Sequence, residues 1–267
     1  MNNFVVIYVC YGDNFNYEII NAKIRRFLAP LDIKTIVIAN TKEEYIFFYD
    51  KNGRTTQKYS GLNSEMEFSG YFYGVVEYFE RNSIKKNVSQ SYIFMNDTLF
   101  SHGKLRKIER LGLTEWKLRS LFFNIRDKEI HGFWHKSIYL RETELKNGYF
   151  NSKFFILHNL NFTEIQSILN LNGVVVSIND ASHYENNIFI SDKYSRFLQR
   201  WLHESDGWYK AQKLNCENKK FFLKKATSIV HEHYITKFVE ENKIKKHCLI
   251  NNSRLTKFVM KFIRLEY

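Results

Sequence analysis

Two neighbouring polar residues, Asn96 and Asp97, end an apolar stretch that begins at Ser91. A carboxylate beside an amide at the end of a buried strand offers oxygen ligands to a divalent cation, and Mg²⁺ or Mn²⁺ held in this way commonly bridges a substrate diphosphate. The structural alternative is that Asp97 and Thr98 cap a following helix. The pair therefore predicts either a cation and phosphate site or a helix start.

Two earlier apolar stretches also end in polar residues. Residues 4–10 are followed by Tyr11, Asp13 and Asn14, and residues 34–40 end in Asn40. In open α/β sheets, ligands bind outside the carboxyl ends of the strands. We therefore expect these strand ends and Asn96-Asp97 to meet in one crevice.

The elements that position these residues follow from the spacing of apolar side chains. A continuous apolar stretch at 4–10, helical spacing at 16–29 and a second apolar stretch at 34–40 predict a parallel βαβ unit. A third strand is expected at 45–49, a helix at 68–79 and a buried strand from Ser91 to Asn96. The expected fold class is α/β, with a Rossmann-like, mostly parallel central sheet flanked by helices.

Beyond residue 101 the regular alternation of strands and helices stops. The later expectations are a partly helical basic stretch at 104–126, an aromatic stretch of mixed structure at 133–160, a late strand at 174–178, and amphipathic helices at 192–203 and 219–242. No repeat or Pro/Gly/Ser linker interrupts the chain. We expect one compact domain.

The charge is distributed unevenly over the 267 residues, whose formal net charge is +12. Residues 1–100 hold 11 basic and 11 acidic side chains, whereas the remainder holds 29 basic and 17 acidic ones. Such asymmetry indicates that the second part of the chain meets phosphate, nucleic acid or an anionic membrane.

The three cysteines, Cys10, Cys216 and Cys248, lie far apart and form no C-x-x-C pair. Neither a disulfide framework nor a zinc ribbon is predicted, and a cytoplasmic location is expected. No signal peptide precedes the first strand, and no 18 apolar residues run uninterrupted. We expect neither secretion by that route nor a membrane span.

The last residues, 254–267, have the pattern of a basic amphipathic helix. Four basic side chains fall on one side and five apolar ones on the other; they are Arg254, Lys257, Lys261 and Arg264 against Leu255, Phe258, Val259, Phe262 and Ile263. Such a helix can lie on an anionic bilayer or dock on the protein core. We favour the membrane surface, with the protein peripheral on the inner face of the cytoplasmic membrane.

In the order of these strands and in three short segments, the chain resembles GT-A glycosyltransferases, and more narrowly the bacterial rhamnan-synthesis proteins of surface polysaccharide assembly. The segments are Met95-Asn-Asp-Thr-Leu-Phe100, Tyr149-Phe-Asn-Ser-Lys-Phe-Phe-Ile-Leu157 and His231-Glu-His-Tyr-Ile235. The resemblance implies transfer of a sugar from a nucleotide-diphosphate sugar to a saccharide or lipid-linked acceptor, in O-antigen, capsule or rhamnan assembly. The expected stereochemical outcome is inversion.

The resemblance also implies a division of labour along the chain. Residues 1–100 would bind the donor, 101–245 would form the acceptor side of the same domain, and 246–267 would be a basic amphipathic segment. Asp97 would hold the cation, Mg²⁺ or Mn²⁺. The donor would be contacted by Tyr11, Asp13, Asn40, Asn63, Gly70 and Asn96. Ala39 stands where many family members have an acid that helps recognise the base.

Transfer with inversion needs a carboxylate that takes the proton from the acceptor hydroxyl. Asp180 follows the late strand at 174–178, Glu232 lies in a segment of the family resemblance, and Asp206 lies in Ser205-Asp-Gly-Trp-Tyr209. Asp180 and Glu232 are the preferred candidates. His231 and His233 are two residues apart, so on a helix they point about 200° apart and do not form a zinc pair.

The aromatic clusters and the charge leave other interpretations open. Phe133-Trp-His135 and Gly207-Trp-Tyr209 can stack on a sugar or belong to the core. A nonenzymatic module that binds nucleic acid would explain the basic charge, but no RNP-type strand, helix-turn-helix or zinc finger is evident, and no nucleic-acid partner is expected. A nucleotidyl- or phosphate-transferring enzyme on a similar fold is the third alternative.

Overall fold

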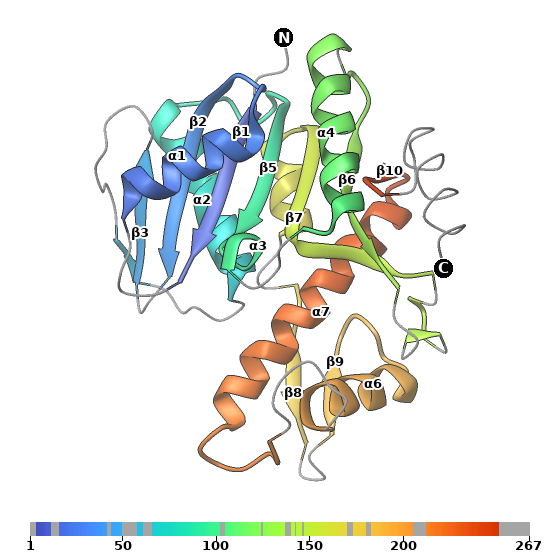
Figure 1. Cartoon of the computed structure of the whole chain (residues 1–267). Helices are drawn as coiled ribbons and strands as arrows, with labels where there is room; N and C mark the ends of the chain where they lie inside the picture. The colour runs from blue at the N-terminus through green and yellow to red at the C-terminus, as the bar shows by residue number, and fades with distance from the viewer. Residues whose placement is uncertain are drawn as a thin grey trace.

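The computed structural model describes most of the chain, and all structural statements concern that part. The described ranges are 4–11, 16–41, 44–49, 58–60, 66–101, 105–123, 125–136, 140–141, 143–145, 147–169, 173–179, 183–204 and 212–250. Within these ranges the protein has an α/β fold with a mixed central sheet flanked by helices (Figure 1).

The central sheet has eight strands in the order β10-β6-β7-β5-β1-β2-β3-β4. In chain order the strands are β1 (Phe4–Cys10), β2 (Ile33–Thr41), β3 (Glu44–Tyr49), β4 (Lys58–Ser60), β5 (Gln90–Asn96), β6 (Glu129–His135), β7 (Tyr149–Leu160) and β10 (Lys245–Cys248). One sheet therefore extends across the two expected halves, 1–100 and 101–245.

The middle of the sheet is a parallel trio in which β1 pairs with β2 on one side and with β5 on the other. The apolar stretch 4–10 is buried along its whole length, as expected for a strand covered on both faces. The register places Cys10 beside Asn40 and Val9 beside Asn96. The carboxyl ends of all three strands therefore meet at one edge of the sheet.

Helices α1 (Tyr17–Leu28) and α2 (Glu67–Asn82) cover opposite faces of this trio. The side chain of Asn16 caps α1 by accepting a hydrogen bond from the Ile19 backbone N–H at 3.0 Å. In α2, Gly74 lets the helix approach β1: a Cβ there would lie 2.7 Å from Cγ2 of Ile7.

Antiparallel strands extend the trio on both sides. On one side β2 pairs with β3 and β3 with β4; on the other, β5 and β6 each pair with β7. Strand β10 adds to the far edge by parallel pairing with β6. The expectation of a mostly parallel sheet thus holds for the central trio, whereas the whole described sheet is mixed.

Two helices complete the cover of the sheet. Helix α4 (Lys107–Phe122) packs its Leu113 and Trp116 into the core that contains α1. Helix α5 (Phe162–Ile168) begins after Asn161, which forms a capping box with Glu164, and packs into the core on the α2 side. The short helix α3 (Thr98–Ser101) follows Asp97 directly.

A smaller unit lies below the sheet in Figure 1 and is joined to it by the long helix α7 (Lys219–Glu241). It contains the hairpin of β8 (Val176–Ile178) and β9 (Tyr184–Asn186) and helix α6 (Asp192–His203). The first part of α7 contributes Ala226 and Val230 to a separate apolar cluster there, and its second part contributes Ile235 and Val239 to the main core. The expected late strand therefore belongs to this hairpin and not to the central sheet.

The end of the chain was expected to form a separate basic segment, 246–267. Its first residues instead continue β10, which starts at Lys245 and belongs to the sheet. The expected amphipathic helix at 254–267 lies outside the described residues. Among the helices that the structure describes, none has the length and apolar character needed to cross a bilayer.

Candidate functional site

The site begins where β1 and β5 end side by side. The Tyr11 backbone N–H donates to Oδ2 of Asp97 at 3.0 Å, and the Asp97 backbone N–H donates to the Val9 carbonyl at 3.0 Å. These bonds fasten the carboxylate to the end of the neighbouring strand. The chain leaves β1 toward β2 through α1 on one face and reaches β5 through α2 on the other, so this position is a topological switch point.

Asn96 and Asp97 have different surroundings. Asn96 is 4% exposed, and its Oδ1 has no hydrogen-bond partner among the described residues. The Asp97 backbone carbonyl accepts bonds from the Phe100 and Ser101 N–H groups, so Asp97 also starts α3. Asp97 therefore starts a helix, as the structural alternative expected, but it does so through its backbone carbonyl. Its carboxylate bonds to Tyr11 instead.

The structure places the other expected donor-binding residues unevenly. Asn40 ends β2 beside Cys10, although its side chain is outside the described part. Gly70 is buried in the first part of α2. Asp13 and Asn63 lie outside the described residues, as do Asp180 and Asp206 among the candidate bases.

Glu232 lies at the same edge of the sheet, in a cluster of polar side chains. Its Oε1 accepts a hydrogen bond from the Ser152 backbone N–H at 2.5 Å. The Ser152 hydroxyl donates to Oε1 of Glu67 at 2.9 Å, and the Tyr71 hydroxyl donates to the Ser152 carbonyl at 2.9 Å. Ser152, near the start of β7, therefore links two carboxylates, one from α2 and one from α7.

The environment of Glu232 favours its neutral form. Part of the residue reaches the surface, but protein atoms surround the carboxyl, and this desolvation raises the pKa of Glu232 to about 7. The hydrogen bonds from Ser152 oppose the shift, and the nearby charge of Glu67 adds to it. A carboxyl with a pKa near neutrality can take up and release a proton under physiological conditions.

Tyr71 connects this cluster to Asp97. The phenol is fully buried, and burial raises its pKa well above the usual value, with further upward contributions from Glu67, Asp97 and Glu232. All three carboxylates are therefore close enough to act on one hydroxyl group. The structure joins Tyr11 and Asp97 by a hydrogen bond, and Asp97 and Glu232 both act on the buried Tyr71 hydroxyl.

Glu67 and Ser152 were missed by the reasoning from sequence. Glu67 is the acidic residue of the first turn of α2, directly before the apolar stretch that predicted the helix. Ser152 lies within the segment Tyr149–Leu157 that contributed to the family resemblance, but no role was given to it. A polar residue inside an aromatic strand was the available signal.

The histidines that flank Glu232 serve packing. The His231 ring stacks on Phe68 with centroids 4.4 Å apart, and its Nε2 lies 3.2 Å from the Ile168 carbonyl oxygen. His233 Nδ1 lies 2.6 Å from the Tyr194 hydroxyl. Of the aromatic clusters, Phe133 is in the core, while Gly207-Trp-Tyr209 lies outside the described residues.

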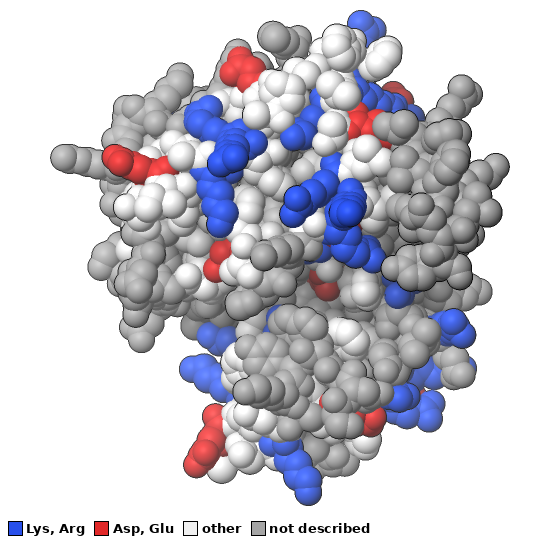
Figure 2. Space-filling view, viewed as in Figure 1, with Lys and Arg blue, Asp and Glu red and all other residues white. Residues whose placement is uncertain are grey.

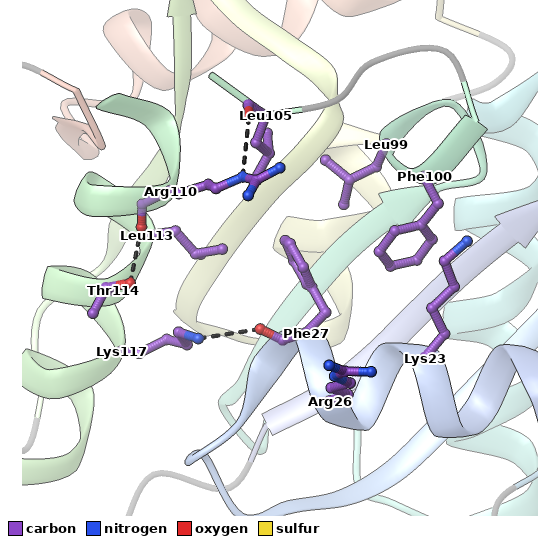
Figure 3. A pocket seen from close by; sticks show the side chains of 10 residues that line it. All are labelled: Lys23, Arg26, Phe27, Leu99, Phe100, Leu105, Arg110, Leu113, Thr114 and Lys117. Atoms are coloured by element: carbon purple, nitrogen blue, oxygen red, sulfur yellow. Dashed lines mark hydrogen bonds between the residues drawn. The ribbon is translucent and has the colours of Figure 1, made fainter. Parts of the chain in front are cut away.

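A groove of about 460 Å³ opens beside the strand ends, between α1, α3 and α4. Figure 3 shows its two kinds of lining: apolar side chains from Phe27, Leu99, Phe100, Leu105 and Leu113, and basic ones from Lys23, Arg26, Arg110 and Lys117. In Figure 2 basic side chains gather over α1 and over α4 on either side of a paler strip.

The basic residues of this groove differ in how they are held. Lys117 donates from Nζ to the carbonyls of Phe27 and Ala29 at 3.1 and 2.6 Å, which joins α4 to the end of α1. Arg110 donates from Nε to the Leu105 carbonyl at 3.1 Å, and the Lys23 ammonium lies 4.6 Å from the centre of the Phe100 ring. The groove can therefore accept a ligand that is both anionic and apolar.

Comparison of the chain with family models, with curated proteins and with solved structures finds no match.

Proposed function

We propose that this protein is a glycosyltransferase that moves a sugar from a nucleotide-diphosphate sugar to a saccharide or lipid-linked acceptor of surface polysaccharide assembly, with inversion. The observation that carries the proposal is the fastening of Asp97 to the end of β1 at the switch point, with Glu67 and Glu232 close by. Ligands of open α/β sheets bind at this position. The family resemblance of the sequence gives the proposal its substrate class.

The donor diphosphate would lie over Tyr11, Asn96 and Asp97. The buried Oδ1 of Asn96, which has no partner among the described residues, and the carboxylate of Asp97 are hard oxygen donors that suit Mg²⁺ or Mn²⁺. These two residues fit such an ion, which would then neutralise charge on the leaving diphosphate. Water and the diphosphate would supply its remaining ligands.

Glu232 is the better supported of the two candidate bases. Its pKa of about 7 allows it to be ionised in a large fraction of molecules and still accept a proton from an acceptor hydroxyl. The Ser152 N–H holds one oxygen of the carboxylate in place. Glu67 bonds to the same serine and would act as a positioning residue, because its charge raises the pKa of Glu232. Asp180 remains a candidate from the sequence.

The groove between α1, α3 and α4 would hold the anionic and apolar end of a lipid-linked acceptor. Its α3 wall, Leu99 and Phe100, belongs to the helix that follows Asp97 directly, so the groove begins next to the end of β5. Lys23, Arg26 and Arg110 would pair with phosphate, and the aromatic and leucine side chains would contact the lipid chain. An arginine pair is suited to phosphate oxygens because each guanidinium can donate two parallel bonds.

The proposal is tested first by binding. Calorimetry and a thermal-shift panel of nucleoside diphosphates and nucleotide sugars, with and without Mg²⁺ or Mn²⁺, should give saturable binding of one nucleotide class. Asp97→Asn should weaken this binding at least tenfold. Asp32→Asn is the matched control, because Asp32 is exposed and precedes β2 at the opposite edge of the sheet.

Product analysis separates the proposed reaction from the alternatives. Release of a free nucleoside diphosphate supports sugar transfer, whereas pyrophosphate or a monophosphate would indicate nucleotidyl or phosphate transfer. Glu232→Gln should abolish turnover while nucleotide binding persists. If the wild-type protein binds no nucleotide with either metal, and binds arbitrary RNA or DNA with a steep salt dependence, the glycosyltransferase proposal is wrong.

A further inference from the structure

A second polar cluster lies at the edge of the sheet opposite Asp97. Glu129 and His131 belong to β6, and His247 belongs to β10. The register places His247 beside His131 and Lys245 beside Glu129. Strand β6 runs parallel to β5, since both are antiparallel to β7, and Glu129 is its first residue. The cluster is therefore separate from the strand ends at Asp97.

The three side chains converge on one point. Oε2 of Glu129 lies 2.9 Å from Nε2 of His131 and 3.1 Å from Nε2 of His247. One ligand atom from each residue lies within 4.8 Å of the other two. The imidazole rings of His131 and His247 stack, with centroids 4.4 Å apart and planes at 14°. Two imidazoles and one carboxylate on adjacent strands thus lie together, with one carboxylate oxygen near both imidazole nitrogens.

We propose that Glu129, His131 and His247 bind a transition-metal ion, with Zn²⁺ as the preferred ion. Two imidazole nitrogens and a carboxylate oxygen are among the ligand sets that bind zinc, and they exclude Mg²⁺ and Ca²⁺, which prefer oxygen donors alone. Tetrahedral geometry with bonds near 2.0 Å places ligand atoms about 3.3 Å apart, so Oε2 of Glu129 would move a few tenths of an ångström from each imidazole nitrogen. The stacked imidazole rings would also turn, so that both nitrogens point at the ion.

The surroundings provide space and a further ligand. A cavity of about 50 Å³ beside the cluster is lined by His131 and His247 and, from α4, by Glu115 and Arg119. One carboxylate oxygen of Glu115, Oε2, is buried and has no hydrogen-bond partner among the described residues. The cavity has room for a water molecule. Glu115 lines the same cavity and would complete the coordination through that water.

Lys245 leaves the proposed ligand atom of Glu129 accessible. Its Nζ contacts Oε1 of Glu129 at 2.8 Å, while Oε2 faces the two imidazoles. The side chain of Lys245 is 53% exposed, so it can turn into solvent when an ion binds. The two carboxylate oxygens are thus divided between a surface ammonium and the buried centre.

The position of the site indicates a structural role. Glu129 is 2% and His131 3% exposed, and the cavity is too small for a substrate. An ion here would tie the edge strand β10 to β6, and Glu115 would tie α4 to both. The fourth position would be filled by a water in a cavity with no room for a substrate, so the ion would serve the structure and not catalysis.

Metal analysis of the full-length chain tests the site. After purification without chelator, the protein should hold about one zinc ion per chain, and zinc titrated calorimetrically into chelator-treated protein should bind with the same stoichiometry. Cobalt substituted for zinc should give the visible absorption of a four-coordinate site. A protein that binds zinc at well below one equivalent would overturn the proposal and leave a hydrogen-bonded ion-pair cluster.

Variants assign the ion to this cluster. His247→Ala and Glu129→Gln should weaken zinc affinity more than about 100-fold, since loss of even an indirect partner costs about 10- to 100-fold. His183→Ala removes an exposed histidine and should change nothing. Asp97→Asn should also retain zinc, which separates this site from the proposed donor site. If zinc binds His247→Ala as it binds the wild type, with circular dichroism showing both folded, the proposal is wrong.

Discussion

Glu232 and Glu129 are carboxylates at opposite edges of the same sheet, and their pKa values are shifted in opposite directions. Burial raises the pKa of Glu232 to about 7. Burial also acts upward on the pKa of Glu129, but hydrogen bonds from His131 and Lys245 and the charge of His247 lower it more, so it lies below the usual range. Desolvation raises the pKa of both residues, so the difference between the two pKa values comes from their hydrogen-bond and charged partners.

The partners explain what each carboxylate can do. Glu232 accepts a hydrogen bond from the neutral backbone of Ser152 and lies near a second acid, Glu67, so ionisation is costly there. Glu129 faces an ammonium and two imidazoles. The first environment suits proton transfer, and the second suits a group that stays anionic and holds a cation. The surroundings thus suit one glutamate to proton transfer and the other to cation binding.

The largest expected effect comes from displacing β10 without changing any polar group. Gly112 of α4 lies against the chain just after β10, where an added Cβ would come within 1.7 Å of the Leu249 carbonyl oxygen. Because the obstacle is backbone, Gly112→Ala must move one of the two segments. We expect a loss of about 3 kcal/mol in the free energy of unfolding, measured by urea denaturation.

The same variant tests whether the two edges are independent. Zinc affinity should fall together with stability, while nucleotide binding at the strand-end crevice should be retained below the unfolding transition. Leu118→Ala, at an exposed position of α4, is the control and should leave both properties unchanged. Equal loss of nucleotide binding and zinc binding would show that the clusters are coupled.

The next effect concerns Glu232 and has a defined pH dependence. Its folded-state pKa of about 7 exceeds the ordinary value of 4.5, so folding takes up a proton between these pH values and the wild type loses stability as pH rises through this window. Glu232→Gln has no carboxyl to ionise at this position, so its stability does not fall in this window for this reason. We expect the variant to be more stable than the wild type by up to about 3 kcal/mol above pH 7, and equal to it below pH 4.5.

Urea denaturation at several pH values measures this difference. Glu241→Gln, at an exposed position near the end of the same helix, should show no such pH dependence relative to the wild type. A Glu232→Gln variant that is less stable than the wild type at pH 8 would mean that the carboxylate is stabilised in its ionised form, and the contrast with Glu129 would disappear.

At the same pH, Glu129→Gln should have the opposite effect and lower the free energy of unfolding. In chelator-treated protein at pH 8, the substitution removes the negative charge that accepts hydrogen bonds from His131 and Lys245. We expect a loss of about 2 kcal/mol in the free energy of unfolding. Stability equal to or above that of the wild type would show that desolvation outweighs the partners of Glu129, as it does for Glu232.

Much of the fold could be predicted from the sequence because local patterns determine it. The buried stretch 4–10, the helical spacing at 16–29 and the apolar stretch before Asn96 gave β1, α1 and β5 with small errors at their ends. The meeting of Tyr11 and Asp97 followed from the rule that parallel strands end at one edge. These features depend on residues close in sequence or on one topological rule.

The polar clusters could not be predicted, because they depend on contacts between distant segments. Glu67 and Glu232 are brought together by Ser152, on a strand whose antiparallel pairing with β5 was not expected. His131 and His247 are neighbours only because the chain returns after α7 to add β10 beside β6. Residues 246–250 were expected to begin a basic segment, so the basic charge here gave no sign that the chain forms a strand of the sheet.

Lys245→Met has the smallest expected effect and separates the two kinds of partner of Glu129. The ammonium is at the surface, where it contacts Oε1 of Glu129 and lies 3.7 Å from Oδ2 of Asp127, so its removal should change the free energy of unfolding by less than about 1 kcal/mol. Loss of its positive charge next to the cluster should nevertheless raise zinc affinity, which calorimetry can measure against the wild type. Lys246→Met is the matched control, because Lys246 pairs with Glu240 instead. If Lys245→Met lowers zinc affinity, the lysine holds Glu129 in position for the ion and does not compete with it.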